Sequence, residues 1–176
     1  MLGDRLCIAT NGVTSVRMSE QELVACDYNN YGCNGGWMTN AILYLENYGV
    51  YSTWCMSYQQ ELNAVTQPCT YRCDSVTDVD TKYFCEQGSM KVLTNSADIM
   101  QEIMTYGSGL ASFGVYEDFY AYSGGIYKHV SGKFSANHAT RIVGWGYDTS
   151  GKLYWQGYNQ WGTLWGENYG TFRIYN

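Results

Sequence analysis

Hydrophobic and polar positions in the first half of the chain recur with the period of amphipathic helices. Residues 18–26 contain Ser19 and, three residues later, Glu22, which is the spacing of a capping box and predicts a helix capped by this serine. Residues 35–49 show the same period and end in Gly49, a typical C-terminal stop. The face that this second helix is expected to bury consists of Trp37, Ala41, Leu45 and Tyr48.

The pattern is lost over residues 51–85, which show no strong period and are rich in cysteine. We expect an irregular stretch held by disulfides there. A last helix is predicted over residues 96–107, and the side chains expected to face inward are Ile99, Met100, Ile103 and Met104.

After Gly107 the period changes to two, which is typical of half-buried strands. The strands are predicted at residues 109–116, 125–130, 138–147, 152–158 and 170–175, separated by glycine-rich or polar turns. A helical first part followed by a strand-rich second part indicates an α+β fold. Active sites favour the cleft between two such lobes.

Charge and apolar run length exclude two classes of partner. The chain of 176 residues has a formal net charge of -6, so its field repels polyanions, and nucleic acid is not an expected partner. Its apolar stretches are interrupted well short of the roughly 20 residues that a membrane helix needs. The sequence shows no signal peptide at Met1, so we expect any targeting segment to be absent or already removed, and we expect no membrane association.

The cysteine content favours disulfides over zinc. The sequence has no CxxC pair and only two histidines, so no metal site is expected. Disulfides favour a secretory or lysosomal compartment. The count is odd, so at least one cysteine is expected to lack a partner within the chain. The seven cysteines are Cys7, Cys26, Cys33, Cys55, Cys69, Cys73 and Cys85.

Three motifs carry a resemblance when they are taken in order. They are "GCNGGW" at 32–37, "NHATRIVGWG" at 137–146 and "YNQWGTLWGENYGTFRI" at 158–174. Together they resemble the papain-like cysteine peptidases, and "DRLCI", "CNGG", "ADIMQEI", "GVYEDFYAYSGGIYKHVSG" and "RIVGWG" resemble the cathepsin B branch. The resemblance implies a helical left lobe, an antiparallel β-barrel-like right lobe and a cleft between them. On this basis residues 1–85 and 86–176 form the two lobes of one structural unit.

The resemblance assigns roles in a Cys-His-Asn version of the catalytic triad. A cysteine peptidase needs a thiolate stabilised by an imidazolium, and an asparagine can fix the tautomer and plane of that imidazole. His138 is then the general acid and base, and Asn159 orients it. By the same resemblance, Trp161 covers the hydrogen bond of this pair from water, and Trp165 packs behind it. On the strand pattern alone, His138 remains open to being a core histidine or a metal ligand, and His129 is given no chemistry.

The resemblance also implies the substrate-binding residues. In the family, the turn at Gly35 and Gly36 exposes backbone groups that pair with an extended polypeptide, and Trp37 lies beside it. A plain helix start is the simpler alternative for these glycines. Ala139 resembles a residue that lines the pocket for the second substrate side chain.

The family's nucleophile is not found in the chain. The motif Cys-Gly-Ser-Cys-Trp and the oxyanion-hole glutamine are expected upstream of Met1, about eight residues upstream for the cysteine. Cys7 also fits the loose spacing to His138, but its neighbours match a disulfide cysteine of the cathepsin B branch. Cys33 resembles another disulfide position. The resemblance implies two bridges inside the chain, Cys26 to Cys69 and Cys55 to Cys73, with the partners of Cys7 and Cys33 upstream and no counterpart for Cys85.

Two departures from the family bear on specificity. The family's Asn-Ser-Trp is Asn159-Gln160-Trp161 here, which puts a longer polar side chain beside the site. The segment between Cys55 and Cys69 is short and holds no histidine, unlike the occluding loop of cathepsin B. Carboxydipeptidase action is therefore not supported, and an endopeptidase is expected.

Two functions follow as expectations. The first is a cysteine endopeptidase that acts on polypeptide substrates, needs no metal or organic cofactor, and works in a lysosome or vacuole or after secretion. As given, the chain lacks the nucleophile and is expected to be inactive alone. The second is a catalytically inactive papain-like binding or structural protein, which would need a protein partner to replace the buried surface lost with the front of the central helix.

Overall fold

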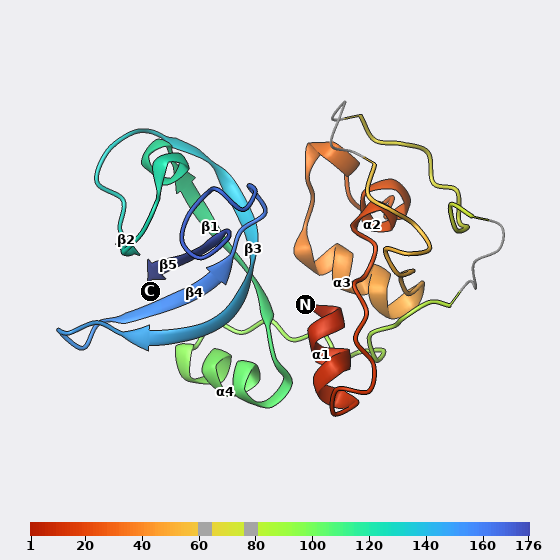
Figure 1. Cartoon of the computed structure of the whole chain (residues 1–176), viewed down its shortest axis with the longest axis horizontal. Helices are drawn as coiled ribbons and strands as arrows, with labels where there is room; N and C mark the ends of the chain where they lie inside the picture. The colour runs from red at the N-terminus through yellow and green to blue at the C-terminus, as the bar shows by residue number, and fades with distance from the viewer. Residues whose placement is uncertain (60–64, 76–80) are drawn as a thin grey trace. The chain divides into compact units, whose positions relative to one another are not determined.

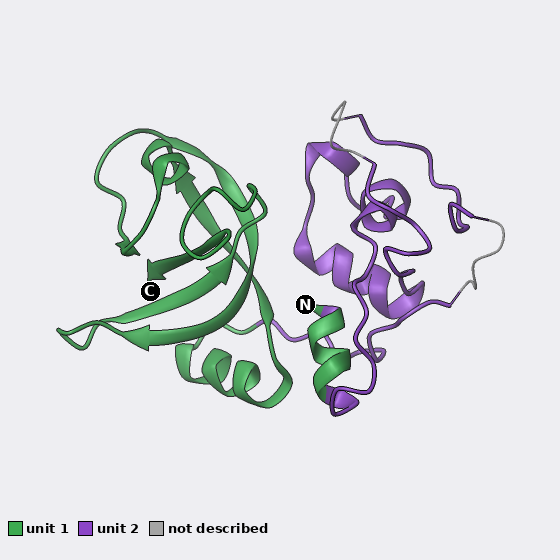
Figure 2. Ribbon diagram, viewed as in Figure 1, with its two compact units in different colours: residues 1, 3–8, 93–176 green, residues 2, 9–92 purple. Residues whose placement is uncertain are grey.

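The computed structural model describes residues 1–59, 65–75 and 81–176, which form two compact units (Figure 2). The first unit contains Met1, Gly3–Ile8 and Leu93–Asn176, and the second contains Leu2 and Ala9–Val92. Helix α1, Leu2–Ala9, therefore groups mostly with the strands, a division that differs from lobes of residues 1–85 and 86–176. Over the described ranges, no helix is both long enough and apolar enough to cross a membrane.

The second unit begins with α2, Glu20–Cys26, which starts where the sequence predicts. The Ser19 hydroxyl accepts a hydrogen bond from the backbone N–H of Glu22 at 3.1 Å. The return half of the predicted capping box is absent from this helix, because the backbone N–H of Ser19 donates to Tyr51 O at 2.8 Å instead. Ser19 thus caps the helix alone and leaves the Glu22 carboxylate available to the core.

The Glu22 side chain is fully buried and organises the polar centre of this unit. Its carboxylate accepts hydrogen bonds from the Tyr44 hydroxyl at 3.1 Å and the Tyr51 backbone N–H at 2.6 Å. Lys82 Nζ lies 2.5 Å from the same carboxylate. A buried charge requires such partners, so these three segments are tied to α2 by one side chain.

Helix α3, Met38–Asn47, follows the short 3₁₀ turn η1, Gly32–Asn34. The face predicted for this helix is wrong in part, because Trp37 and Tyr48 are 68% and 60% exposed. The buried residues of the helix are Tyr44, Leu45 and Glu46. The Glu46 carboxylate accepts hydrogen bonds from the backbone N–H groups of Gly88 and Met90 at 3.2 and 2.9 Å, so a distant loop makes its burial possible.

The described parts of the stretch from residue 51 to 85, which are residues 51–59, 65–75 and 81–85, are irregular, as the lack of a period predicts. Its described residues contain isolated β-bridges but no helix or longer strand. Two disulfides join Cys26 to Cys69 and Cys55 to Cys73, the pairing that the resemblance implies. A small core of Tyr51, Cys55, Met56 and Cys73 surrounds the second bridge.

The first unit contains a five-stranded sheet and helix α4, Ser96–Tyr106 (Figure 1). The strand order is β1-β3-β4-β5-β2, and the sheet is open, so the expected barrel does not close in the described residues. The β2–β5 pair is parallel, whereas the other pairs are antiparallel. The strands are β1 Gly109–Tyr116, β2 Ile126–Tyr127, β3 Phe134–Tyr147, β4 Leu153–Tyr158 and β5 Thr171–Tyr175.

Two strands differ in length from the prediction. Strand β3 starts earlier than residue 138, because Phe134 already pairs with Tyr116 of β1. Strand β2 ends well before residue 130, because the backbone N–H groups of Val130 and Ser131 donate to the Asp118 carboxylate at 2.8 and 3.1 Å. In α4, Met104 is 73% exposed, so its predicted inward position is wrong.

The two faces of the sheet have different neighbours. One face carries an aromatic core of Val115, Phe119, Tyr122 and Phe172. Successive side chains of a strand point to opposite faces, so Phe113 and its partner His138 share the face of Val115, whereas Arg141 lies on the other face. On that other face, Arg141 Nη1 binds the Asp4 carboxylate of α1 at 3.1 and 2.9 Å.

Candidate active site

The candidate site begins with His138 in the middle of β3. Its imidazole is partly buried and lies edge-on to the ring of Phe113, with 6.1 Å between ring centroids. The Trp161 ring lies 5.0 Å from it at an interplanar angle of 33°. The strand therefore presents one histidine to an aromatic wall that limits its rotation and its contact with water.

Asn159 supplies the polar contact of this histidine. His138 Nε2 and Asn159 Oδ1 are 2.9 Å apart. Asn159 follows the last residue of β4, and its backbone N–H donates to Gly170 O at 2.9 Å. Gly170 has φ +100° and a Cβ there would lie 3.2 Å from Gly162 O, so the close loop that holds Asn159 requires a glycine.

The backbone of Gln160 settles the orientation of the Asn159 amide. Its N–H donates to Asn159 Oδ1 at 2.9 Å, so this atom is the oxygen acceptor and cannot be the NH₂ group. His138 Nε2 must then carry the hydrogen, which leaves Nδ1 with its lone pair. Nδ1 makes no hydrogen bond with any residue that the structure describes. The neutral imidazole is thereby arranged to accept a proton at one defined atom.

The two tryptophans form the apolar surroundings of this pair. Trp161 stacks on Tyr120 with 5.0 Å between centroids, and Trp165 lies edge-on to Trp161 at 5.2 Å. The indole N–H of Trp165 donates to Tyr120 O at 3.0 Å. Both rings pack on the aromatic core through Phe119. The structure thus places Trp161 and Trp165 in one aromatic cluster beside His138 and Asn159.

Ala139 and Gln160 meet beside the pair. The Gln160 Nε2 donates to the backbone oxygen of Ala139 at 2.9 Å. Ala139 is exposed, and strand alternation puts its side chain on the face opposite His138. The long side chain that replaces the family's serine is therefore folded back onto β3. Nothing in the sequence period signals this contact.

His129, the other histidine, has a different environment. Its Nδ1 lies 3.1 Å from Asp118, and its ring stacks on Tyr116 with 3.8 Å between centroids. Asp118 also accepts from the Tyr127 hydroxyl at 2.5 Å. These contacts fasten the loop after β2, and they supply a structural role for a histidine to which the motifs assign no chemistry.

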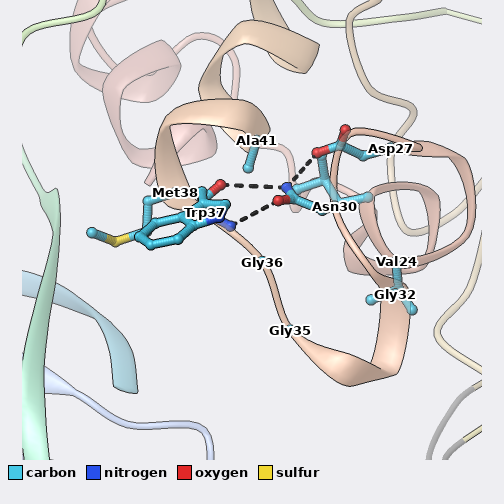
Figure 3. A pocket seen from close by; sticks show the side chains of 10 residues that line it. Val24, Asp27, Asn30, Gly32, Gly35, Gly36, Trp37, Met38 and Ala41 are labelled. Carbon is cyan, nitrogen blue, oxygen red and sulfur yellow. Dashed lines mark hydrogen bonds between the residues drawn. The ribbon is translucent and has the colours of Figure 1, made fainter. Parts of the chain in front are cut away.

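The predicted substrate-binding glycines lie in the second unit, beside an open pocket of roughly 210 Å³ (Figure 3). Asn30 holds this segment, because its Oδ1 accepts from the Trp37 backbone N–H at 2.7 Å and its Nδ2 donates to Asp27 at 2.6 Å. A Cβ on Gly36 would lie 2.2 Å from Asn30 Oδ1, so glycine is required by this close approach. Gly35 has φ +93° and needs glycine for its backbone conformation.

The backbone of Gly36 is available for pairing. Its N–H and C=O make no hydrogen bond with the residues that the structure describes, although Asn30 fixes the residue that follows. The sequence motifs do not identify Asn30 as a site residue. The one feature of the sequence that points to it is an asparagine shortly before the two glycines.

Cys7, Cys33 and Cys85 are thiols rather than disulfide cysteines. The residues in the described ranges contain no group of three or more histidine, cysteine, aspartate or glutamate side chains that could hold a metal ion.

Comparisons with known proteins identify the family of the chain. The family described as "Papain family cysteine protease" matches residues 1–176. The "Gut-specific cysteine proteinase" of Caenorhabditis elegans is 34% identical over 99% of this chain and 58% of its own length. "Cathepsin B" of Dictyostelium discoideum is 39% identical over 97% of this chain and 57% of its own length.

Solved structures give the same result. The structure of proCathepsin B from Trypanosoma congolense superposes with a TM-score of 0.86 at 32% identity, covering 99% of this chain and 60% of that one. A Carica candamarcensis cysteine protease in complex with E-64 has a TM-score of 0.76 at 27% identity, covering 99% of this chain and 74% of that one. The chain thus spans less than two thirds of the curated relatives named here. Its fold, motifs and matches together establish that it belongs to the papain family of cysteine proteases, with cathepsin B-like relatives.

Proposed function

We propose that the protein is a cysteine endopeptidase in which His138 is the general acid and base and Asn159 orients it. The observation that carries this proposal is the short contact between His138 Nε2 and Asn159 Oδ1, with the Gln160 N–H on the same oxygen. This arrangement leaves Nδ1 as the single proton acceptor of the ring. Family membership supplies the class of chemistry.

The proposed reaction is acyl transfer through a thioester. Nδ1 takes the proton of a cysteine thiol, and the thiolate sulfur forms a bond to the peptide carbonyl carbon. The tetrahedral intermediate collapses with cleavage of the C–N bond, and the imidazolium returns its proton to the leaving amine. Water then attacks the thioester with His138 as base, which releases the carboxylic acid and restores the thiol.

The nucleophilic cysteine is proposed to belong to a part of the protein outside residues 1–176. The three thiols at Cys7, Cys33 and Cys85 stand in sequence surroundings that do not match the family's nucleophile motif. The length of the relatives is consistent with a longer protein. In this view the 176 residues supply the base, its orienting amide and the substrate-binding glycines, and they are inactive alone.

The proposed substrates are extended polypeptides. The open N–H and C=O of Gly36, held by Asn30, suit pairing with a substrate main chain in the manner of strand addition. Trp37 is 68% exposed beside this segment and offers apolar contact area. Ala139 is proposed to line the pocket for the second substrate side chain.

The proposed location is a lysosome or vacuole, or the outside of the cell. The two disulfides favour an oxidising compartment. No nucleic-acid or membrane partner is proposed, given the net charge of -6.

The test is peptide hydrolysis by the protein as isolated from its natural source or expressed with its natural flanking sequence. We expect thiol-dependent cleavage with a kcat/KM that falls at least about a hundredfold in His138→Ala, and less in Asn159→Ala. The matched control is His129→Ala, which removes a histidine of the same unit and should retain activity within a few-fold.

The alternative of an inactive binding or structural protein predicts the opposite outcome. Folded protein with its flanking sequence would then cleave no peptide and react with no thiol-directed inhibitor, whatever residue stands at 138. That result would overturn the proposed peptidase function.

A further inference from the structure

Strand β4 stops pairing with β3 just before the candidate active site. The last paired residues are Tyr158 on β4 and Arg141 on β3. If the antiparallel register continued, Gln160 would stand opposite Ala139, and their backbone groups would be in reach of each other. The ladder ends there because the chain turns, and the backbone N–H of Gln160 donates to Asn159 Oδ1 instead.

The side chain of Gln160 takes over the contact that the backbone gives up. Its Nε2 donates to the Ala139 carbonyl oxygen at 2.9 Å. One residue thus uses its backbone N–H to orient the Asn159 amide and its side-chain amide to fasten the loop to β3. The residue that receives this second bond directly follows His138 in the chain.

Asn159 has little else to hold its side chain. Its Nδ2 is buried and has no hydrogen-bond partner within the described ranges. The orientation of the amide therefore depends on its oxygen, whose hydrogen-bond partners among the described residues are the Gln160 N–H and His138 Nε2. If the loop moved away from β3, the contact between Asn159 Oδ1 and His138 Nε2 would lengthen, and the amide would keep only the Gln160 N–H, a partner that belongs to the loop itself.

We infer that Gln160 is a positioning residue for the His138–Asn159 pair, acting as a clamp between the loop after β4 and strand β3. This inference rests on the proposed function, which gives the pair its catalytic role. A serine, which the family motif carries here, has one heavy atom beyond Cβ and cannot span the same gap with its side chain. The clamp is thus a property of this chain's own sequence.

The test uses substitutions that remove the donor while keeping or shortening the side chain. Gln160→Met keeps the length without hydrogen-bonding groups, and Gln160→Ser introduces the family residue. The matched control is Gln101→Met, because Gln101 Nε2 also makes an exposed 2.9 Å hydrogen bond, to Thr105 Oγ1 within α4. Both bonds have a glutamine amide as donor, are exposed and are 2.9 Å long, but the Gln101 bond lies within α4 and does not involve the loop after β4.

The readout is the imidazole of His138, observed by nitrogen NMR in protein labelled at histidine. Wild-type His138 should be mainly the Nε2–H tautomer when neutral. In Gln160→Met and Gln160→Ser, the ratio of minor to major tautomer should increase about fivefold, the factor that corresponds to one ordinary hydrogen bond. Hydrogen exchange of the Gln160 backbone amide should accelerate by a similar factor, while amides within β4 stay protected.

Two results would overturn the inference. One is an unchanged tautomer ratio and unchanged Gln160 exchange in both variants, as expected for Gln101→Met. The other is a uniform loss of protection across the sheet, which would mean general destabilisation rather than positioning. Failure of the proposed function is a separate outcome. Wild-type protein would then show no thiol-dependent hydrolysis, even though the tautomer ratio of His138 changes in the Gln160 variants.

Discussion

Arg141 and Asp4 join the histidine-bearing strand to the first helix of the chain. Arg141 Nη1 contacts both carboxylate oxygens of Asp4 at 3.1 and 2.9 Å, and the Ser108 hydroxyl donates to the same carboxylate. Arg141 lies on the face of β3 opposite His138. Strand β3 is therefore held from both faces, by aromatic rings on one and by an ion pair on the other.

This ion pair should contribute measurably to stability. We expect a double-mutant cycle of Asp4→Ala and Arg141→Ala, followed by urea unfolding, to give a coupling energy of about 1–2 kcal/mol because Arg141 Nη1 contacts both oxygens of the carboxylate. The exposed pair Arg17–Glu20 is the control, and its coupling should stay below about 0.5 kcal/mol. Equal coupling in the two cycles would show that Arg141 and Asp4 do not fasten the helix.

The buried carboxylate of Glu22 should be a larger determinant of stability. Glu22→Gln keeps the shape but removes the charge that Lys82 contacts, so we expect a loss of about 3 kcal/mol in the free energy of unfolding. Tyr44→Phe removes one of its hydrogen bonds and should cost about 1 kcal/mol. Chemical denaturation measures both, and the account of this core is wrong if Glu22→Gln is as mild as Tyr44→Phe.

The requirement for glycine at position 36 can be tested by size alone. Gly36→Ala adds a Cβ that would lie 2.2 Å from Asn30 Oδ1, so Asn30 must move and release the Trp37 backbone. We expect KM for peptide substrates to rise about tenfold, with a smaller change in kcat. Gly109→Ala is the control because nothing lies within 4 Å of its added Cβ. If the KM of Gly36→Ala matches that of Gly109→Ala, the substrate main chain does not pair with this segment.

Glu167 should make stability depend on acid pH. Hydrogen bonds from Arg173, at 3.0 and 2.7 Å, lower the pKa of Glu167 although partial burial opposes this. A lowered folded-state pKa gives stability that is complete above the unfolded pKa and is lost as the pH falls through the folded value. The Tm difference between wild type and Glu167→Gln should thus be constant above about pH 5 and shrink below about pH 4. A difference that grows in acid would contradict this assignment.

Local sequence patterns predict the helices and strands of this chain better than they predict its long-range contacts. Strand β1 occupies the predicted residues because alternation of side chains decides it. Strand β2 is shorter than predicted because the backbone N–H of Val130 donates to the Asp118 carboxylate and does not continue the strand. No local sequence pattern predicts that hydrogen bond. The buried face of α3 differs because Glu46 finds its partners at Gly88 and Met90, far along the chain.

In the candidate site, too, local motifs predict residues better than they predict long-range contacts. The motifs single out His138 and Asn159, and the structure places His138 Nε2 and Asn159 Oδ1 2.9 Å apart. They do not identify Asn30 or the Gln160 clamp, because each works through a hydrogen bond whose partner lies outside any local motif. Long-range polar contacts of this kind are visible only once the strands are paired.

The most direct test of the central claim is the site and rate of alkylation by a thiol-directed peptidyl epoxide, followed by mass spectrometry on the protein with its natural flanking sequence. We expect a single adduct on a cysteine outside residues 1–176, formed about a hundredfold more slowly in His138→Ala and at the wild-type rate in His129→Ala. An adduct on Cys7, Cys33 or Cys85, or labelling that is indifferent to His138, would contradict the claim that His138 serves a thiolate supplied by another part of the protein.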